Sequence, residues 1–394
     1  MIVNSKSLNI CTGGNFMIVM RIKLDHIYSF NNFEVDFTYP KKVKNSLIRD
    51  EYLSGNESFR YKKVNIFIGS NASGKTTLIK SIWSVIYFLN KKESISIERM
   101  INKNFKKSTI EMDFVTSRNN KNILNRVIIN TINSDSVKIK MAHKMINLTT
   151  TINYEKASEK LDEIETVFKD YLEVLNECKF SFGWYTSLPI TEAPFDEVYF
   201  ENVKSEAEEK EYIHILTKVL STLDPSILSV RRSRDSKDAY VINHKSNNSL
   251  VIPKGMKLAD IPLLSSGTKN GINIANVIYS IKKHQFGVYL IDEQFSFMNS
   301  EIEASLIATM VSLLGTGEQI FITTHNTNIL SLSFPIHSFY FLRKNKYESD
   351  IEIACASKYE NRNNVLVKNL YDNDLFSTAP NVSGIFSLGA KYEA

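Results

Sequence analysis

Cysteine is scarce in this chain: Cys11, Cys178 and Cys355 are the three among 394 residues, and none belongs to a Cys-x-x-Cys pair. This spacing excludes a disulfide scaffold and a cysteine-based zinc site, and it favours a reducing, cytoplasmic location. Glycine and proline are also few, at 14 and 8 residues, which excludes a collagen. No apolar run approaches the ~18–20 residues that cross a bilayer, so we expect no membrane partner.

The N-terminal residues lack both the long apolar core and the small-residue cleavage site of a signal peptide. We expect residues 1–16 to be a flexible leader, because the first strand-like run begins at Met17.

No charge of one sign dominates, since the chain has 48 Lys and Arg residues and 43 Asp and Glu residues. A net charge of +5 permits contact with nucleic acid without arguing for it, and it excludes a highly basic nucleic-acid binder. The hydrophobic fraction of 43% and the charged fraction of 23% are those of an ordinary globular protein. The function must therefore be argued from motifs.

Apolar periodicity divides the chain into two α/β parts, residues 17–147 and 224–394, separated by a helical insertion at 148–223. Residues 40–61 are expected to form a loop, and an aromatic, proline-bearing segment at 180–200 is expected to be a connector or a cap between two helices of the insertion. The elements expected around the motifs are a strand at 64–68, a helix at 76–89, a meander at 108–140, a helix from 266, a strand at 288–291, a helix at 300–314 and a strand at 319–323.

A phosphate-binding loop is the strongest motif, because residues 69–76 match Gly-x4-Gly-Lys-[Ser/Thr] between an apolar strand and an apolar helix. In such a loop the backbone N–H groups point at phosphate oxygens, Lys75 contacts the β- and γ-phosphates, and Thr76 ligates Mg²⁺. The residues predicted to bind nucleotide here are Gly69, Ser70, Asn71, Ala72, Ser73, Gly74, Lys75, Thr76 and Thr77.

A second motif is the apolar strand that ends in Asp292 and Glu293. In a protein with a phosphate loop, an Asp in this place holds magnesium and the next Glu polarises the attacking water. We therefore predict Thr76 and Asp292 at the metal, and Lys75 and Glu293 as catalytic residues. An apolar run ending in two acids is otherwise an ordinary strand entering a turn.

Two further motifs carry a family resemblance. Leu264-Ser265-Ser266-Gly267-Thr268 opens a helix, and a β-branched strand ends at His325. Together with the phosphate loop and the acidic strand end, they resemble the heads of ABC-type ATPases of the RecF, SMC and OLD-like class. Taken alone, the first is a serine N-cap and the second a histidine at a strand end.

The resemblance implies a fold: an α/β head with a mixed-sheet core, an antiparallel β subdomain and a helical insertion. It also implies that Ser265, Ser266 and Gly267 reach the ATP of a second copy, in a homodimer or higher oligomer, and that His325 senses the γ-phosphate. The implied cofactors are ATP and Mg²⁺. Asn299, Ser300 and Glu301 occupy the place of the family's D-loop.

The sequence departs from the family at one point. The family carries a magnesium-ligating glutamine between the phosphate loop and the insertion, whereas Gln285, Gln294 and Gln319 all come later. Either another side chain replaces it, with Asp113 or the pair Asn119–Asn120 as candidates, or the coordination of magnesium is altered.

The resemblance extends to compact ATPases of bacterial anti-phage, abortive-infection systems, which control a separately encoded effector such as a nuclease or toxin. An intrinsic nuclease is not expected, because residues 326–394 offer only Asp372-x-Asp374. The alternatives are a DNA-repair or chromosome-maintenance head and a scaffold that binds ATP without turnover. For a DNA-clamping head, the basic residues that could contact phosphates are Lys103, Lys106, Lys107, Arg231, Arg232 and Arg234.

Overall fold

The computed structural model describes residues 16–43, 46–118, 121–133, 137–187, 205–235, 239–246, 248–253, 265–295, 298–344, 350–360, 362 and 365–378. The predicted leader, apart from Phe16, lies outside these residues, as do Leu264 and the pair Asn119–Asn120.

A mixed sheet forms the centre of the molecule, in the order β10-β14-β15-β5-β16-β17 among the described residues, and only β17 runs antiparallel to its neighbour. Its strands are β5 (Val64–Ile68), β10 (Trp184–Ser187), β14 (Val288–Asp292), β15 (Gln319–Thr324), β16 (Phe339–Lys344) and β17 (Ile351–Cys355). Apolar side chains cover both faces. Tyr289 and Ile291 pack on one face, and Val288 and Leu290 on the other. Such two-sided burial explains the uninterrupted apolar runs in the sequence.

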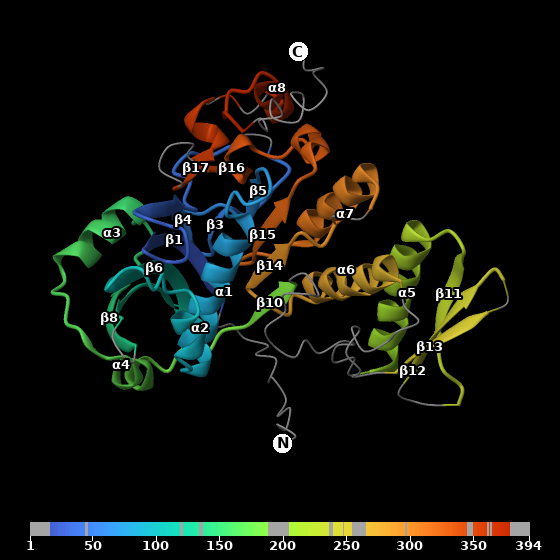
Figure 1. Cartoon of the computed structure of the whole chain (residues 1–394), viewed down its shortest axis with the longest axis horizontal. Coiled ribbons are helices and arrows are strands. Elements are labelled where there is room, and N and C mark those ends of the chain that lie inside the picture. Colours follow the sequence, from blue (N-terminus) through green and yellow to red (C-terminus); the bar gives the residue numbers. More distant parts are fainter. Residues whose placement is uncertain are drawn as a thin grey trace, which may run out of the picture.

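A second, antiparallel sheet has the order β2-β1-β6-β7-β8-β9 among the described residues (Figure 1). Its strands are β1 (Met17–Asp25), β2 (Phe33–Asp36), β6 (Lys107–Arg118), β7 (Lys121–Ile132), β8 (Lys138–Asn147) and β9 (Lys169–Asp170). A small hairpin, β3 (Tyr52–Leu53) and β4 (Asn56–Arg60), lies where the sequence predicted a loop. It turns at Gly55, whose φ is 77°.

Helices fill the space around the central sheet. They are α1 (Lys75–Lys91), α2 (Ile95–Glu98), α3 (Tyr154–Glu163), α4 (Tyr171–Cys178), α5 (Glu206–Leu223), α6 (Ser266–Lys282), α7 (Ser300–Leu313) and α8 (Val367–Asp372), with short 3₁₀ turns at Thr327–Ser331, Ile336–Ser338 and Ala356–Lys358. Helix α1 shares a core with the antiparallel sheet and one face of the central sheet. Helices α5, α6 and α7 share a core with the other face. No helix among the described residues is long and apolar enough to cross a membrane.

A three-stranded antiparallel sheet packs on α5 and is set apart from the rest (Figure 1). It consists of β11 (Ile227–Arg232), β12 (Ala239–His244) and β13 (Ser249–Pro253).

The predicted fold class is confirmed: the chain is mixed α/β, with a parallel-core sheet and antiparallel sheets. Of the two helices expected in 148–223, the second is α5, whereas the first is divided into α3 and α4 with β9 between them; the stretch also supplies β10. The segment 180–200 was expected to be a connector or cap; within its described part, residues 180–187, β10 instead pairs in parallel with β14 and extends the central sheet.

Candidate functional site

The phosphate loop joins the buried strand β5 to helix α1, as predicted. Gly74 precedes the helix with a φ of 96°, and Ala72 has a φ of 59°. A Cβ atom on Gly69 would lie 2.4 Å from the Leu342 carbonyl oxygen, and one on Gly74 would lie 2.5 Å from Ile351 Cδ1. Gly69 is therefore required by the space around the loop, because a backbone oxygen cannot move aside, and Gly74 is required by its left-handed conformation.

Lys75 is 3% exposed and turns back onto its own loop. Its Nζ donates to the carbonyl oxygens of Gly69 at 3.0 Å and Ser70 at 3.1 Å, and it lies 3.5 Å from Glu293 Oε1. Burial lowers the pKa of Lys75, while the Glu293 carboxylate opposes that shift. This ammonium group is thus held at the point where the loop can receive phosphate oxygens.

Asp292 ends β14 beside the first turn of α1. Its Oδ1 accepts hydrogen bonds from the hydroxyls of Thr76, at 3.1 Å, and Thr323. Its Oδ2 is buried without a hydrogen-bond partner. Burial raises the pKa of this carboxyl group.

The two residues predicted to hold Mg²⁺ therefore lie together, and one of their oxygens lacks the partner that a buried carboxylate normally has. A hard cation that takes oxygen ligands fits this donor set, with Thr76 and Asp292 as its ligands or as ligands of its water shell. Among the described residues no cluster of three or more His, Cys, Asp or Glu side chains could hold a metal by itself. Substrate phosphate oxygens would complete the coordination, as is usual for magnesium.

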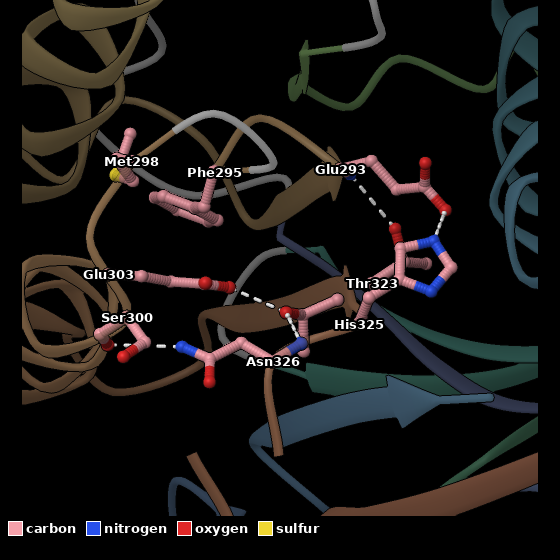
Figure 2. A pocket seen from close by; sticks show the side chains of 9 residues that line it. Glu293, Phe295, Met298, Ser300, Glu303, Thr323, His325 and Asn326 are labelled. Atoms are coloured by element: carbon pink, nitrogen blue, oxygen red, sulfur yellow. Dashed lines mark hydrogen bonds and ion pairs between the residues drawn. The ribbon is translucent and has the colours of Figure 1, made fainter. Parts of the chain in front are cut away.

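Glu293 and His325 face each other at the ends of β14 and β15 (Figure 2). His325 Nε2 lies 2.7 Å from Glu293 Oε1, and His325 Nδ1 lies 3.4 Å from Lys75 Nζ. Glu293 has a φ of 47°, and its N–H donates to Thr323 Oγ1 at 3.0 Å, which fixes the turn after the strand. The hydrogen bond from His325, aided by its charge and that of Lys75, lowers the pKa of Glu293.

A pocket of about 290 Å³ opens beside this pair, and four of its polar side chains were not predicted as site residues: Glu303, Thr323, Thr324 and Asn326. Glu303 on α7 is buried and accepts a hydrogen bond from Thr324 Oγ1 at 2.5 Å, and burial raises its pKa. The Asn326 side chain donates to the Ser300 carbonyl at 3.0 Å (Figure 2). Glu303 precedes the buried Ile307 and Met310 by one and two helical turns. An acid on an apolar helical stripe was the signal that could have revealed it.

The serine–glycine motif lies apart from these residues. Ser265 caps α6, and its Oγ accepts from Thr268 N at 3.1 Å and contacts Thr268 Oγ1 at 2.8 Å. Ser265, Ser266 and Gly267 are exposed. The structure thus brings together the phosphate loop, Asp292, Glu293 and His325, and it leaves the serine–glycine motif at the surface.

Asp113, one candidate to replace the missing glutamine, is engaged elsewhere. It is fully buried in β6, where it accepts two hydrogen bonds from Arg126, at 2.7 and 2.8 Å, and one from Tyr154 at 2.6 Å. Arg21 lies 3.1 Å away. This ion cluster occupies the carboxylate, which argues for a structural role of Asp113 and against it as the replacement for the missing glutamine.

Strand β10 places a polar side chain that the sequence did not indicate. Ser187 lies in register with Ile291, directly before Asp292, and is buried. Because β10 and β14 are parallel, their carboxyl ends meet at the same edge of the sheet.

The basic residues form two separate groups. Arg231 and Arg232 lie on β11, and Lys107 begins β6 on the far side of the molecule (Figure 1). Arg232 also pairs with Glu209 at 2.9 Å. Asp372 and Asp374 lie at the end of α8 and just after it.

No protein-family model matches the chain, and no curated protein matches it in sequence. Solved structures do resemble it. An SMC head bound to the C-terminal winged-helix domain of ScpA is 14% identical, with a TM-score of 0.45 over 87% of this chain and 99% of that one. The SMC head domain from Thermotoga maritima is 12% identical, with a TM-score of 0.40 over 86% and 98% of the two chains. The recombination mediator protein RecF is 10% identical, with a TM-score of 0.42 over 86% and 99%.

Proposed function

We propose that this chain is an ABC-type ATPase head that binds ATP with Mg²⁺ and hydrolyses it. The observation that supports this most directly is the convergence of Lys75, Thr76, Asp292, Glu293 and His325 at one edge of the central sheet. All five residues lie at the start of α1 or at the ends of β14 and β15, which are far apart in the sequence, and no structural need of the sheet alone requires that combination.

Each side chain has a part in the proposed reaction. Lys75 and the loop N–H groups bind the β- and γ-phosphates, and Thr76 with Asp292 holds the magnesium. The bound metal would offset the charge that develops on the phosphate oxygens. Glu293, kept ionised by its neighbours, accepts a proton from the attacking water. His325 turns to the γ-phosphate and thereby releases its hydrogen bond to Glu293.

A second copy of the chain completes the proposed site. Ser265, Ser266 and Gly267 are exposed at the N-terminus of a long helix, where backbone N–H groups attract anions. In a head-to-tail dimer this end would meet the γ-phosphate bound by the partner.

The test of this function is Glu293→Gln. Without the carboxylate the chemical step is expected to slow by ~10²–10⁴-fold, while ATP affinity is retained. Phosphate release measures turnover, and light scattering after gel filtration with ATP measures the trapped dimer. Turnover equal to that of the parent would contradict the role of Glu293. Absence of turnover in the parent itself would favour the scaffold that binds ATP without hydrolysis.

For the biological role we propose a sensor or regulatory subunit of a bacterial anti-phage system that controls a separately encoded nuclease or toxin. This rests on analogy with compact ATPases of similar organisation. The DNA-clamping alternative predicts that affinity for duplex DNA falls steeply between low and physiological salt. A nuclease or toxin gene beside this one would support defence, and a repair gene would support the alternative.

A further inference from the structure

A second pocket, of about 430 Å³, lies on the antiparallel sheet, away from the phosphate loop. Strands β6, β7 and β8 form its floor, and the segment that follows α4 forms its wall. Apolar side chains line much of it: Ile123, Met145, Phe180 and Phe182. The proposed ATPase reaction uses none of these residues.

Three polar side chains form a chain of contacts in this pocket. Cys178 Sγ lies 3.1 Å from His143 Nδ1, and His143 Nε2 lies 3.0 Å from Asn125 Oδ1. They come from three elements: the end of α4, β8 and β7. Cys178 and His143 are each partly exposed.

The surroundings of Asn125 fix the tautomer of His143. The Asn125 amide nitrogen donates to Thr116 Oγ1 at 3.0 Å and to the Ile123 carbonyl at 3.1 Å, so its oxygen faces the imidazole. That oxygen can only accept, and therefore Nε2 of His143 carries the hydrogen. Nδ1 is left with a lone pair directed at the thiol. This is the arrangement of a nucleophile, a base and a group that orients the base.

Burial keeps both members of the pair neutral at rest. It lowers the pKa of His143 to about 4, and it raises the pKa of Cys178 to about 11 with a smaller contribution from Glu177. Lys179 is the other charged residue at the pocket. At neutral pH the imidazole therefore has an unprotonated Nδ1, and the thiol becomes a nucleophile only as its proton leaves.

We propose that Cys178 is an acyl-accepting nucleophile, with His143 as its general base, Asn125 as a positioning residue and the apolar pocket as the site for the acyl chain. The substrate class is an activated acyl donor, a thioester or ester with an apolar acyl group. Sulfur attacks the carbonyl carbon as its proton passes to His143 Nδ1. The bond from carbon to the leaving group then breaks, that group takes the proton from His143, and a thioester remains on Cys178.

The experiment treats the full chain with p-nitrophenyl butanoate. Nitrophenolate release gives the rate, and peptide mass spectrometry locates the butanoyl group. We expect one butanoyl group on Cys178 and none in Cys178→Ser. An adduct confined to other residues would overturn the proposal.

The base is tested with His143→Gln, which we expect to acylate Cys178 ~10²-fold more slowly or worse. His214→Ala, which removes an exposed histidine from α5, is the matched control and should react like the parent. Equal rates in the parent and in His143→Gln would refute general-base catalysis.

The pH dependence of the acylation rate of the parent tests the same role of His143 without a substitution. With the base deprotonated above about pH 4 and the thiol protonated below about pH 11, the rate should be nearly flat between pH 6 and 9. An unassisted thiol would instead react about tenfold faster for each unit by which the pH rises toward its pKa, as its thiolate fraction rises, and that slope would count against the proposal.

The role of Asn125 is tested with Asn125→Asp, which adds a carboxylate beside Nε2 of His143. This variant should move the acid limb of the pH profile to higher pH, because the carboxylate raises the pKa of His143. An unmoved limb would show that Asn125 does not act through His143.

Discussion

At the scale of single residues, the candidate site is a set of charged and polar side chains that contact one another. Lys75 contacts loop carbonyls and Glu293, and Glu293 in turn contacts His325. The types and order of these residues could be predicted from the sequence, because the phosphate loop and the acidic strand end have fixed local patterns. The contact of Glu293 with Thr323 and that of Glu303 with Thr324 could not be predicted, since both threonines read as ordinary strand residues.

Replacing Lys75 tests the phosphate loop. Lys75→Ala removes a charged donor to phosphate, whose loss costs about 1.5–3 kcal/mol, so we expect ATP affinity to fall by ~10–100-fold. Titration calorimetry measures it. Lys91→Ala, at the exposed end of the same helix, should bind ATP like the parent. Unchanged affinity in Lys75→Ala would contradict the assignment of the loop.

Replacing Asp292 separates stability from function. Burial raises the pKa of the Asp292 carboxyl group, so the folded state binds its proton more tightly than the unfolded state does. The protonated carboxyl group therefore contributes to the free energy of unfolding at low pH, and this contribution is lost as the pH rises. Asp292→Asn should therefore raise the free energy of unfolding of the nucleotide-free protein at pH 7, and the gain should vanish below the ordinary pKa of Asp. Urea denaturation at several pH values measures it. A loss of stability at pH 7 would refute the argument, and loss of magnesium-dependent ATP binding is expected in the same variant.

At the scale of elements, strands with a continuous apolar pattern were predictable and β10 was not. The runs at β5, β14 and β15 are buried on both faces, which the sequence shows directly. Strand β10 is four residues long, lies among aromatic residues and is only partly buried. Its identity as a strand depends on pairing with β14, a contact between distant parts of the chain that no local pattern reports.

The ion cluster of the antiparallel sheet gives a prediction at this scale. Asp113→Asn leaves Arg126, which is 3% exposed, without its buried carboxylate, and such a loss costs about 3–5 kcal/mol. Urea denaturation should show this drop, while ATP affinity stays that of the parent. Glu34→Gln removes an exposed partner of Arg21 and should cost less than about 1 kcal/mol. A large fall in magnesium-dependent ATP affinity in Asp113→Asn would reinstate Asp113 as a metal ligand.

At the scale of the whole molecule, the serine–glycine motif and the phosphate loop belong to separate surfaces. In the proposed dimer, Gly267→Asp would place a carboxylate against the partner's γ-phosphate. We expect this variant to bind ATP as a monomer but to lose ATP-dependent dimerisation and turnover by ~10-fold or more, because like charges repel across a desolvated contact. Light scattering measures the mass.

The control for that variant is Asn248→Asp, which adds the same charge on an exposed turn between β12 and β13. It should dimerise like the parent. Normal dimerisation of Gly267→Asp would exclude the motif from the interface.

Helix α1 runs from the phosphate loop to residues beside the pocket that contains Cys178. One end begins at Gly74 in the phosphate loop. At the other end, Lys92 Nζ donates to Asn176 Oδ1 at 2.6 Å, and Phe182 N donates to Asn90 Oδ1 at 3.0 Å. A helix of 17 residues is about 25 Å long, so a rotation of about 5° at the loop would displace its far end by ~2 Å. The rate at which Cys178 is labelled would then report from a distance whether the loop holds a nucleotide.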